Sequence, residues 1–252
     1  MTEELHLDRA RAESFGSVAD NYDRYRPGFS AALIDQLAAV RPNGVLDIAC
    51  GTGKVSVALA SRGLDVVGVE LDPRMAEIAR GHGIPVEIAT FENWDPNGRQ
   101  FDLITCGNAW HWINPALGIP KVAKLLRPGG TMARLWSFYT VDEPLSSAID
   151  AIYRDYPGQR SHVNQPPRRN MSLPDAFRDY PQFTDFESKL DLAVEPLTGE
   201  AWVELIATYS DHRQLPPEQL VELQRKVAET IRQHGGVVPA RRGNFVQIAR
   251  RA

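Results

Sequence analysis

The sequence has few cysteines and no excess of positive charge. Only Cys50 and Cys106 occur among its 252 residues, too few for a disulfide framework or a cysteine-based zinc cluster. The formal net charge is −4 at pH 7, whereas proteins that bind nucleic acid or anionic membranes need clustered positive charge. The sequence therefore argues against a nucleic-acid partner and favours a reduced, cytoplasmic environment.

Long apolar runs are also missing. The sequence contains no apolar stretch of the roughly 18 residues that a membrane-spanning helix requires. The opening segment, MTEELHLDRARAESF, is charged and has no apolar signal-peptide region. We therefore expect no membrane span. With 43% hydrophobic and 24% charged residues, the chain has the composition of a globular protein with a large core.

Short apolar runs alternate with helical segments from about residue 44 to residue 136. The runs cover residues 45–49, 65–69, 86–89, 101–106 and 131–136. Runs this uniformly apolar are typical of strands buried on both faces, and their alternation with helices indicates strand–helix–strand units. We therefore predict an α/β fold with a doubly wound, mostly parallel sheet.

The rhythm changes after Trp136. A long strand is expected over 183–194, helices over roughly 198–209 and 216–233, and a last strand over 244–249. A strand, two helices and a returning strand suggest that the helices form a cap over the carboxyl ends of the strands. Ligands bind at those ends in open parallel sheets.

The most informative segment is VLDIACGTGKVS, residues 45–56, in which a strand leads through Gly51 and Gly53 directly into a helix. Glycines there allow close backbone approach to a ligand, and the first amides of the helix face a negative group. Glu70 lies 17 residues after Gly53, at the end of the next strand. A carboxylate at that place accepts hydrogen bonds from ribose hydroxyls. The two features together predict a nucleoside-containing ligand.

Three nucleoside ligands can be compared. A P-loop is excluded because Val55 follows Gly53-Lys54 and Ile48 stands where its first glycine is needed. A dinucleotide fold needs a third glycine where Ser56 stands, and Asp47 would lie poorly beside a pyrophosphate. A cationic ligand such as S-adenosylmethionine tolerates an acid at Asp47. An NAD-dependent oxidoreductase remains as the alternative.

The segments VLDIACGTGKVS, VVGVELDPRMAEIA, FENWD, FDLITCGNAWHWI and LLRPGGTMA resemble successive motifs of the class I S-adenosylmethionine-dependent methyltransferases. Within that family, FGSVADNYDRYRPGF and the Ala-Trp-His-Trp segment resemble a small-molecule subgroup that includes trans-aconitate methyltransferases. The resemblance implies a seven-stranded Rossmann-like sheet with a helical cap. It divides the chain into a lid helix (1–30), a cofactor-binding core (31–136), and further strands with a substrate cap in the same domain (137–252).

The resemblance also implies which residues surround the cofactor. Tyr22 and Arg26 would form a lid over its carboxylate, and Glu70 would hold the ribose hydroxyls. Leu71 would cover one face of the adenine, and Phe91 and Glu92 would contact its edge. The glycine loop and Asn108 would hold the methionine part. The implied cofactor-binding residues are Tyr22, Arg26, Asp47, Ala49, Gly51, Gly53, Glu70, Leu71, Phe91, Glu92 and Asn108.

Several residues are candidates for the methyl-acceptor side. His111, between Trp110 and Trp112, is either a general base or a pocket-wall and packing residue. The two tryptophans are either core or substrate walls. His212, between the capping helices, is a candidate for the substrate cavity. Arg160, Arg168 and Arg169 either hold an anionic substrate or belong to a solvated loop.

These features together predict an S-adenosylmethionine-dependent methyltransferase that acts on a small molecule by in-line displacement and releases S-adenosylhomocysteine. The acceptor group is a carboxylate, hydroxyl, amine or carbon. We expect no metal site, because the six histidines include no His-x3-His pair. We expect no nucleic-acid or membrane partner, and a monomer or homodimer. A non-catalytic cofactor-binding protein that regulates a second protein is a further alternative.

Overall fold

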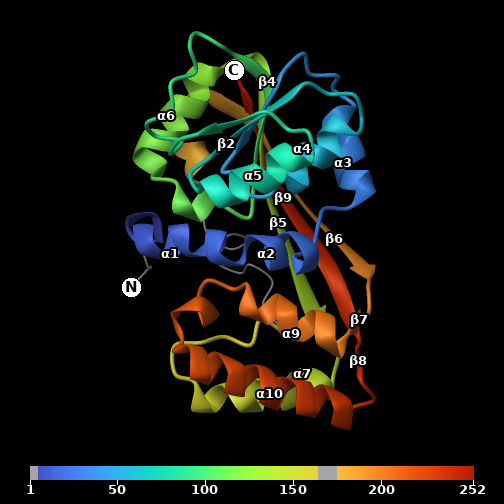
Figure 1. Ribbon diagram of the computed structural model, residues 1–252. Coiled ribbons are helices and arrows are strands. Elements are labelled where there is room, and N and C mark those ends of the chain that lie inside the picture. The colour runs from blue at the N-terminus through green and yellow to red at the C-terminus, as the bar shows by residue number, and fades with distance from the viewer. Residues whose placement is uncertain (1–4, 164–174) are drawn as a thin grey trace.

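A computed structural model describes residues 5–163 and 175–252 (Figure 1). Its main sheet has seven strands in the order β3-β2-β1-β4-β5-β9-β6. The strands are β1 Val45–Ile48, β2 Val66–Glu70, β3 Val86–Ile88, β4 Phe101–Gly107, β5 Leu126–Val141, β6 Phe183–Val194 and β9 Ala240–Arg251. Neighbouring strands from β3 to β5 pair in parallel, and β9 is antiparallel to both β5 and β6. The predicted seven-stranded, mostly parallel sheet is confirmed.

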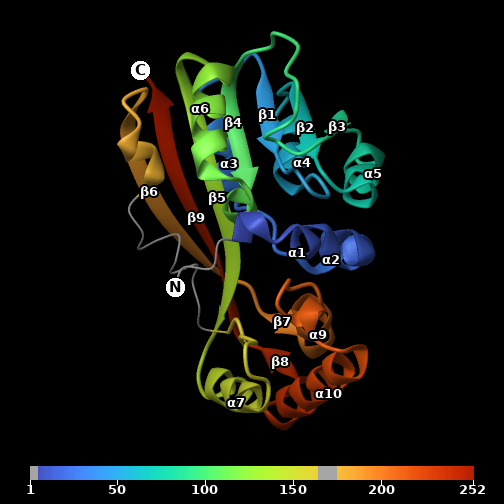
Figure 2. The ribbon, with the colours of Figure 1, turned by 90° about the vertical axis from the view of Figure 1, so that its left-hand side faces the viewer.

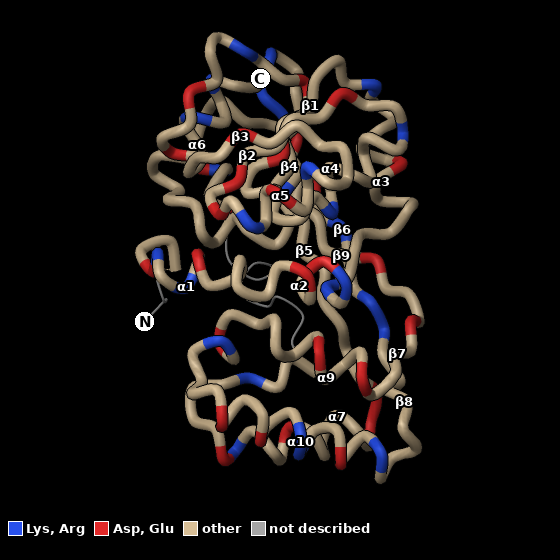
Figure 3. The backbone as a smooth tube through the Cα atoms, viewed as in Figure 1, with Lys and Arg blue, Asp and Glu red and all other residues tan. Residues whose placement is uncertain are grey.

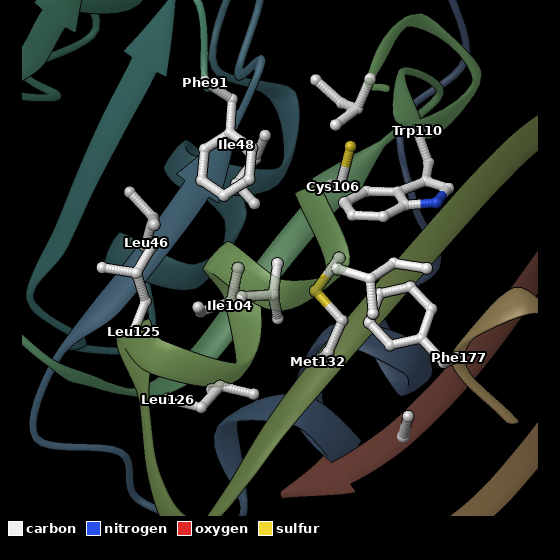
Figure 4. Packing of buried hydrophobic residues seen from close by; sticks show 14 of the residues in the cluster. Leu46, Ile48, Phe91, Ile104, Cys106, Trp110, Leu125, Leu126, Met132 and Phe177 are labelled. Atoms are coloured by element: carbon white, nitrogen blue, oxygen red, sulfur yellow. The ribbon is translucent and has the colours of Figure 1, made fainter. Parts of the chain in front are cut away.

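Helices cover both faces of the parallel half. Helices α3 (Ala31–Ala38) and α4 (Lys54–Ala60) pack on one face, and α6 (Pro115–Leu125) packs on the other. Figure 4 shows the α6 side, where Ile104 and Met132 of the strands lie close to Leu125 and Leu126. The helices on both faces of the sheet explain why the strands are almost continuously apolar. Both cysteines are free and buried.

Three helices begin where short polar residues predict them. The Ser30 side chain accepts from the Leu33 amide at α3 (3.3 Å), and the Asn114 side chain accepts from the Ala116 amide at α6 (3.0 Å). Helix α5 (Pro73–Gly81) begins at Asp72, which accepts from the Arg74 amide (2.9 Å). Each cap satisfies an amide that has no partner within its helix.

Strands β5 and β9 are much longer than the predicted runs 131–136 and 244–249. They pair without interruption from Thr131–Arg250 to Val141–Ala240. In Figure 2 this ribbon continues below the core toward the cap. The polar residues that lengthen it, among them Arg241 and Arg242, break the apolar pattern on which the predicted boundaries depended.

The cap consists of α7 (Leu145–Ile152), α9 (Gly199–Ala207), α10 (Pro217–Gln233) and a small ladder of β7 (Leu197–Thr198) and β8 (Val237–Val238). It has its own hydrophobic cluster, centred on Trp202, Leu205, Leu223, Val227 and Ile231, each buried. Leu223, Val227 and Ile231 of α10 recur at helical spacing and therefore lie on the face that packs into this cluster, whereas Leu220 is only partly buried.

Acidic and basic residues are interspersed along α10 (Figure 3). Glu222 pairs with Arg225, and Glu229 pairs with Arg232, one helical turn apart. Across residues 5–163 and 175–252, the helices are too short or too polar to cross a membrane.

The lid, expected within residues 1–30 as a helix, is not one continuous helix. It consists of α1 (Arg9–Glu13), a 3₁₀ segment η2 (Ser14–Val18) and α2 (Ala19–Tyr25). Gly16 in the middle packs so closely on Asp72 that a Cβ atom there would overlap the carboxylate. Figures 1 and 2 both place the lid between the core and the cap.

Candidate functional site

A cavity lies at the carboxyl ends of β1, β2 and β4, beneath the lid. It holds about 980 Å³ of space between protein atoms, counting the part open to solvent. Its walls come from the strand ends, from the lid and from the segment between β4 and α6. Nine of the implied cofactor-binding residues line it: Tyr22, Asp47, Ala49, Gly51, Glu70, Leu71, Phe91, Glu92 and Asn108.

The loop between β1 and α4 has the left-handed backbone that its glycines permit. Gly51 has φ +58° and Gly53 has φ +87°. A Cβ atom at Gly53 would lie 3.2 Å from the Cβ of Ala79, so this glycine also lets α5 pack against the loop. Gly51 lines the cavity, whereas Gly53 lies outside its lining and shapes the loop instead.

Glu70 ends β2 and is only 7% exposed. Its carboxylate accepts from the Gly51 amide (2.8 Å) and from the Asp72 amide (2.9 Å). Burial raises the pKa of this carboxyl, and these backbone amides oppose the rise. Each carboxylate oxygen has a second lone pair, so Glu70 can accept further hydrogen bonds from a ligand in the cavity.

Asp47 is buried beside the glycine loop and held by two hydroxyl groups. Ser56 donates to its carboxylate at 2.5 Å and Thr105 donates at 2.8 Å. Burial raises the pKa of Asp47 to about 6, and both hydroxyls oppose that rise. Neither hydroxyl donor was predicted from the sequence. Strand register would have identified Thr105, which is the β4 residue directly beside Asp47.

The adenine end predicted from the family resemblance is formed by β2, β3 and the loops after them. Phe91 is 3% exposed and lines the cavity with Leu71. Glu92 also lines it, and one of its carboxylate oxygens accepts from the Asn114 amide (2.9 Å). The start of α6 therefore fixes the position of this carboxylate.

Asn108 follows β4 in a left-handed conformation, with φ +55°. Its side-chain amide donates to the Ser137 hydroxyl (3.0 Å), and its side-chain oxygen accepts from the Ser137 amide (2.8 Å). This exchange fixes the turn that leads out of β4, so Asn108 lines the cavity with its side-chain amide already engaged.

Arg26 lies elsewhere than the resemblance implied. Its guanidinium donates to the Thr208 hydroxyl (2.8 Å) and to the Thr208 carbonyl (2.9 Å). It also lies 4.1 Å from the ring centre of Tyr209. Arg26 is not part of the cavity lining, and in this structure it joins the lid to the cap.

Lys54 is a lining residue that the sequence analysis did not single out. It is the first residue of α4, and its ammonium donates to the Asp23 carbonyl of the lid (2.6 Å). Burial lowers the pKa of Lys54. Lys54 could have been predicted from its position directly after Gly53, because the first turn of this helix faces the ligand.

The two tryptophans separate into a core residue and a wall residue. Trp110 is buried among core side chains, with its ring centre 5.2 Å from that of Phe177 (Figure 4). Trp112 lines the cavity and meets the ring of Phe15 edge-on, with 6.0 Å between centres. Phe15 and Arg9 bring the lid into the same wall.

His111 does not line the cavity. Its ring packs against Trp112, with 4.9 Å between ring centres. Burial, together with the positive charges of Arg11 and Arg26, lowers the pKa of His111 to about 4. This arrangement favours the packing role over the general-base role.

His212 is also outside the cavity, in contrast to the substrate contact expected of it. It is fully buried in the cap, with Nδ1 at 2.6 Å from the Ile206 carbonyl oxygen and Nε2 at 2.9 Å from the Arg160 carbonyl oxygen. Arg160 is exposed, and Arg168 and Arg169 lie outside the described residues. In the described part of the chain, α9 and α10 contribute nothing to the cavity wall because the lid lies between.

Three cap side chains have spacing that could hold a metal ion. The ligand atoms of His162, Asp211 and His212 lie within 4.8 Å of one another. His162 Nε2 is 2.9 Å from the Asp211 carboxylate, and both ring nitrogens of His212 face carbonyl oxygens. The histidines come together only in the folded cap, so sequence spacing gave no sign of them.

Comparisons with known proteins show that this chain is similar to methyltransferases. Residues 45–130 match the family model of a methyltransferase domain. An uncharacterized methyltransferase of Mycobacterium tuberculosis is 34% identical over 207 residues, which is 78% of this chain and 76% of that protein. A ubiquinone biosynthesis O-methyltransferase of Dechloromonas aromatica is 29% identical over 50% of this chain and 62% of its own length.

Solved structures share the fold. A protein of Anaeromyxobacter dehalogenans, provisionally assigned as a type II methyltransferase, has a TM-score of 0.65 at 21% identity, covering 90% of this chain and 98% of that one. A methyltransferase of Thiobacillus denitrificans in complex with S-adenosylhomocysteine has a TM-score of 0.51 at 16% identity, covering 90% and 94%. With its glycine loop, its acidic strand ends and these relatives, the chain belongs to the class I S-adenosylmethionine-dependent methyltransferases.

Proposed function

We propose that this enzyme methylates a small organic acceptor. The main support for this proposal is the lid that lies across the cavity. Phe15, Tyr22 and Trp112 form an aromatic wall under α1 and α2. An acceptor must fit between that wall and the strand ends, which suits a small molecule better than a polymer. The net charge of −4 also opposes a nucleic-acid acceptor.

The residues present fit the cofactor that the family uses. Asp47 places a buried carboxylate beside the loop, where the cationic methionine end would lie, with Ala49 and Gly51 as the adjoining backbone. Glu70 would accept from the ribose hydroxyls, and Leu71, Phe91 and Glu92 would enclose the adenine. Bound S-adenosylmethionine supplies a methyl group whose bond to sulfur breaks, leaving its electrons on sulfur, as the acceptor lone pair bonds to the carbon.

The protein's own contribution to this step is alignment and exclusion of water. The aromatic wall holds the acceptor opposite the sulfur, and the lid closes the cavity over both. Among the described lining residues none is a histidine. We favour a carboxylate acceptor, since it attacks as an anion and needs no base, and the resemblance to trans-aconitate methyltransferases points the same way.

The test is transfer of a labelled methyl group from S-adenosylmethionine into a cell extract, separated into small-molecule, protein and RNA fractions. We expect label in the small-molecule fraction, and mild alkali should release it as methanol because carboxylate methyl esters hydrolyse. If the label in the small-molecule fraction is stable to alkali, the acceptor group is an amine, hydroxyl or carbon and not a carboxylate. Label in protein or RNA would overturn the small-molecule acceptor, and tight cofactor binding without any transfer would support a non-catalytic protein.

We further propose the working division into a lid (1–30), a cofactor core (31–136) and strands with a cap (137–252). The lid and core would supply the cofactor site, and the cap would hold the lid in place through Arg26.

A further inference from the structure

Strand β6 forms one edge of the main sheet (Figure 2). It runs for 12 residues and pairs with β9 on one side only, as far as the described residues show. Its neighbour β9 is buried along most of its length, whereas nearly all of β6 from Glu187 onward is exposed. Long exposed edges can pair with further strands, and proteins normally protect them.

The exposed stretch carries large apolar side chains. Leu190 is 42% exposed, Leu192 is 53% exposed and Val194 is 77% exposed. Because side chains alternate between the two faces of a strand, these three lie on one face. They form an apolar stripe on an edge that can still accept a partner strand.

The opposite face of the same stretch carries charges of both signs. Lys189 and Asp191 lie two residues apart and therefore on one face. Neither forms an ion pair within the described residues. A lone lysine on an edge opposes pairing, but an acid directly opposite it would remove that opposition.

Two copies of this strand can pair antiparallel about a two-fold axis, with residues opposite one another at equal distances from a central residue. A bulge between Thr184 and Glu187 interrupts the ladder with β9, and the regular segment runs from Glu187 to Val194. Leu190 is at the middle of that segment. With Leu190 at the axis, Lys189 lies opposite the partner's Asp191, and Asp191 lies opposite the partner's Lys189.

Other registers are less favourable. An axis at Lys189 places two lysines opposite each other and Glu187 opposite the partner's Asp191, and an axis at Asp191 places two aspartates opposite each other. An axis at Ser188 brings Asp185 of the bulge opposite the partner's Asp191, and an axis at Leu192 leaves only residues 190–194 paired. Like charges directly opposite destabilise a sheet pair, and opposite charges stabilise it.

We propose that β6 pairs with β6 of a second copy of this chain, centred on Leu190, so that the enzyme is a two-fold symmetric dimer with one continuous sheet. The Leu190 side chains of the two copies meet at the axis, and Leu192 lies opposite the partner's Ser188. The contact is far along the sheet from the cavity at the ends of β1 and β2 (Figure 2), so each copy keeps its own site.

Charge exchange tests this register. In sedimentation velocity, the wild type is expected at twice the 28.1 kDa chain mass. Lys189→Asp and Asp191→Lys should each be monomeric, because every cross-strand charge pair becomes like-charged. The double variant Lys189→Asp/Asp191→Lys should be dimeric again. Mixing the two single variants should give a heterodimer, because one strand is then acidic and the other basic at both positions.

Glu218→Lys on the exposed start of α10 is the matched control and should stay dimeric. Circular dichroism and S-adenosylhomocysteine binding show whether each variant is folded. A monomeric wild type at about 100 μM, a concentration that populates complexes of micromolar affinity, would overturn the proposal. Dimers that survive both single changes, or single variants that do not associate on mixing, would overturn the register.

Discussion

The parallel half of the sheet and the helical cap differ in what they give to the site. Most polar side chains of the cavity wall come from the core, at the ends of β1 to β4 and the start of α4, and the lid adds Arg9 and Tyr22, whereas the described residues of α9 and α10 reach none of it. Yet the cap is no loose appendage, since it has its own buried cluster around Trp202. We infer from this difference that the core binds the cofactor and that the cap acts on the site through the lid.

The lid forms hydrogen bonds both with the cap and with the core. Toward the cap, the Asn21 amide donates to Glu204 (2.8 Å), and Arg213 donates to the Ser17 hydroxyl (2.6 Å), in addition to Arg26 with Thr208. Toward the core, Lys54 donates to the Asp23 carbonyl, and Arg74 donates to the Glu13 carbonyl (3.3 Å). Four predictions test this division of roles, beginning with the largest effect.

Trp202→Ala should break the cap. The indole is fully buried at the centre of the cap cluster, and removing such a ring costs about 3–5 kcal/mol of unfolding free energy. Urea unfolding measures the loss, and Trp202→Phe is the conservative control. If the variant retained wild-type stability, the separate cap core would be disproved. The fraction that is still folded should bind S-adenosylhomocysteine nearly normally.

Glu70→Ala should weaken cofactor binding by the core. Loss of charge-assisted hydrogen bonds to the ribose should weaken S-adenosylhomocysteine binding by about 1.5–3 kcal/mol, or roughly 10- to 150-fold. Calorimetry measures the affinity, and thermal melting shows whether loss of the bonds to the Gly51 and Asp72 amides also unfolds the loop. Unchanged affinity in a folded variant would remove Glu70 from the ribose site.

Cofactor binding should depend on pH through Asp47. Because burial raises the pKa of Asp47 to about 6, its carboxylate is charged above that pH and becomes neutral as pH falls through it. Affinity for the cationic S-adenosylmethionine should therefore fall about tenfold between about pH 7.5 and pH 5. The neutral-sulfur product should show a smaller fall. In Asp47→Asn the pH dependence should vanish, while Asp35→Asn on exposed α3 should retain it.

Arg26→Met tests whether Arg26 joins the lid to the cap or holds the cofactor carboxylate, and its expected effect is the smallest of the four. If Arg26 acts by joining lid and cap, turnover should fall about three- to tenfold, while affinity for S-adenosylhomocysteine changes little. Should Arg26 instead hold the cofactor carboxylate, affinity for S-adenosylhomocysteine would fall strongly. Affinity for methylthioadenosine, which lacks the amino-acid part, would then be spared. Calorimetry with the two ligands separates these outcomes.

The core could be predicted well from sequence because its signals are local. A strand buried on both faces must be apolar throughout, and a helix start exposes amides that a serine, asparagine or aspartate satisfies. Residues 45–56 combine such a strand with two glycines at positive φ, Gly51 and Gly53, directly before a helix. The same locality makes Glu70 recognisable from sequence as a residue at the strand end, where it lines the cavity.

What sequence did not predict depended on contacts between distant segments. Ser56 was considered only as a missing glycine, although its hydroxyl holds Asp47. Arg26, His111 and His212 carry chemically versatile side chains, and only the packed lid and cap show which way each one points. The close packing of Gly16 in the lid is similar, because its contact, Asp72, lies far along the chain.

The uninterrupted β5–β9 ribbon limits how the cavity can open. A cap attached by flexible linkers could swing away as a unit, but here two hydrogen-bonded strands run from the core to the start of the cap, and bending them would break ladder bonds. The lid, by contrast, leads into the core through only the short segment 26–30. Exchange of product for fresh cofactor should therefore be governed by transient detachment of the lid, a lid-opening event of the microsecond-to-second class, rather than by a swing of the whole cap.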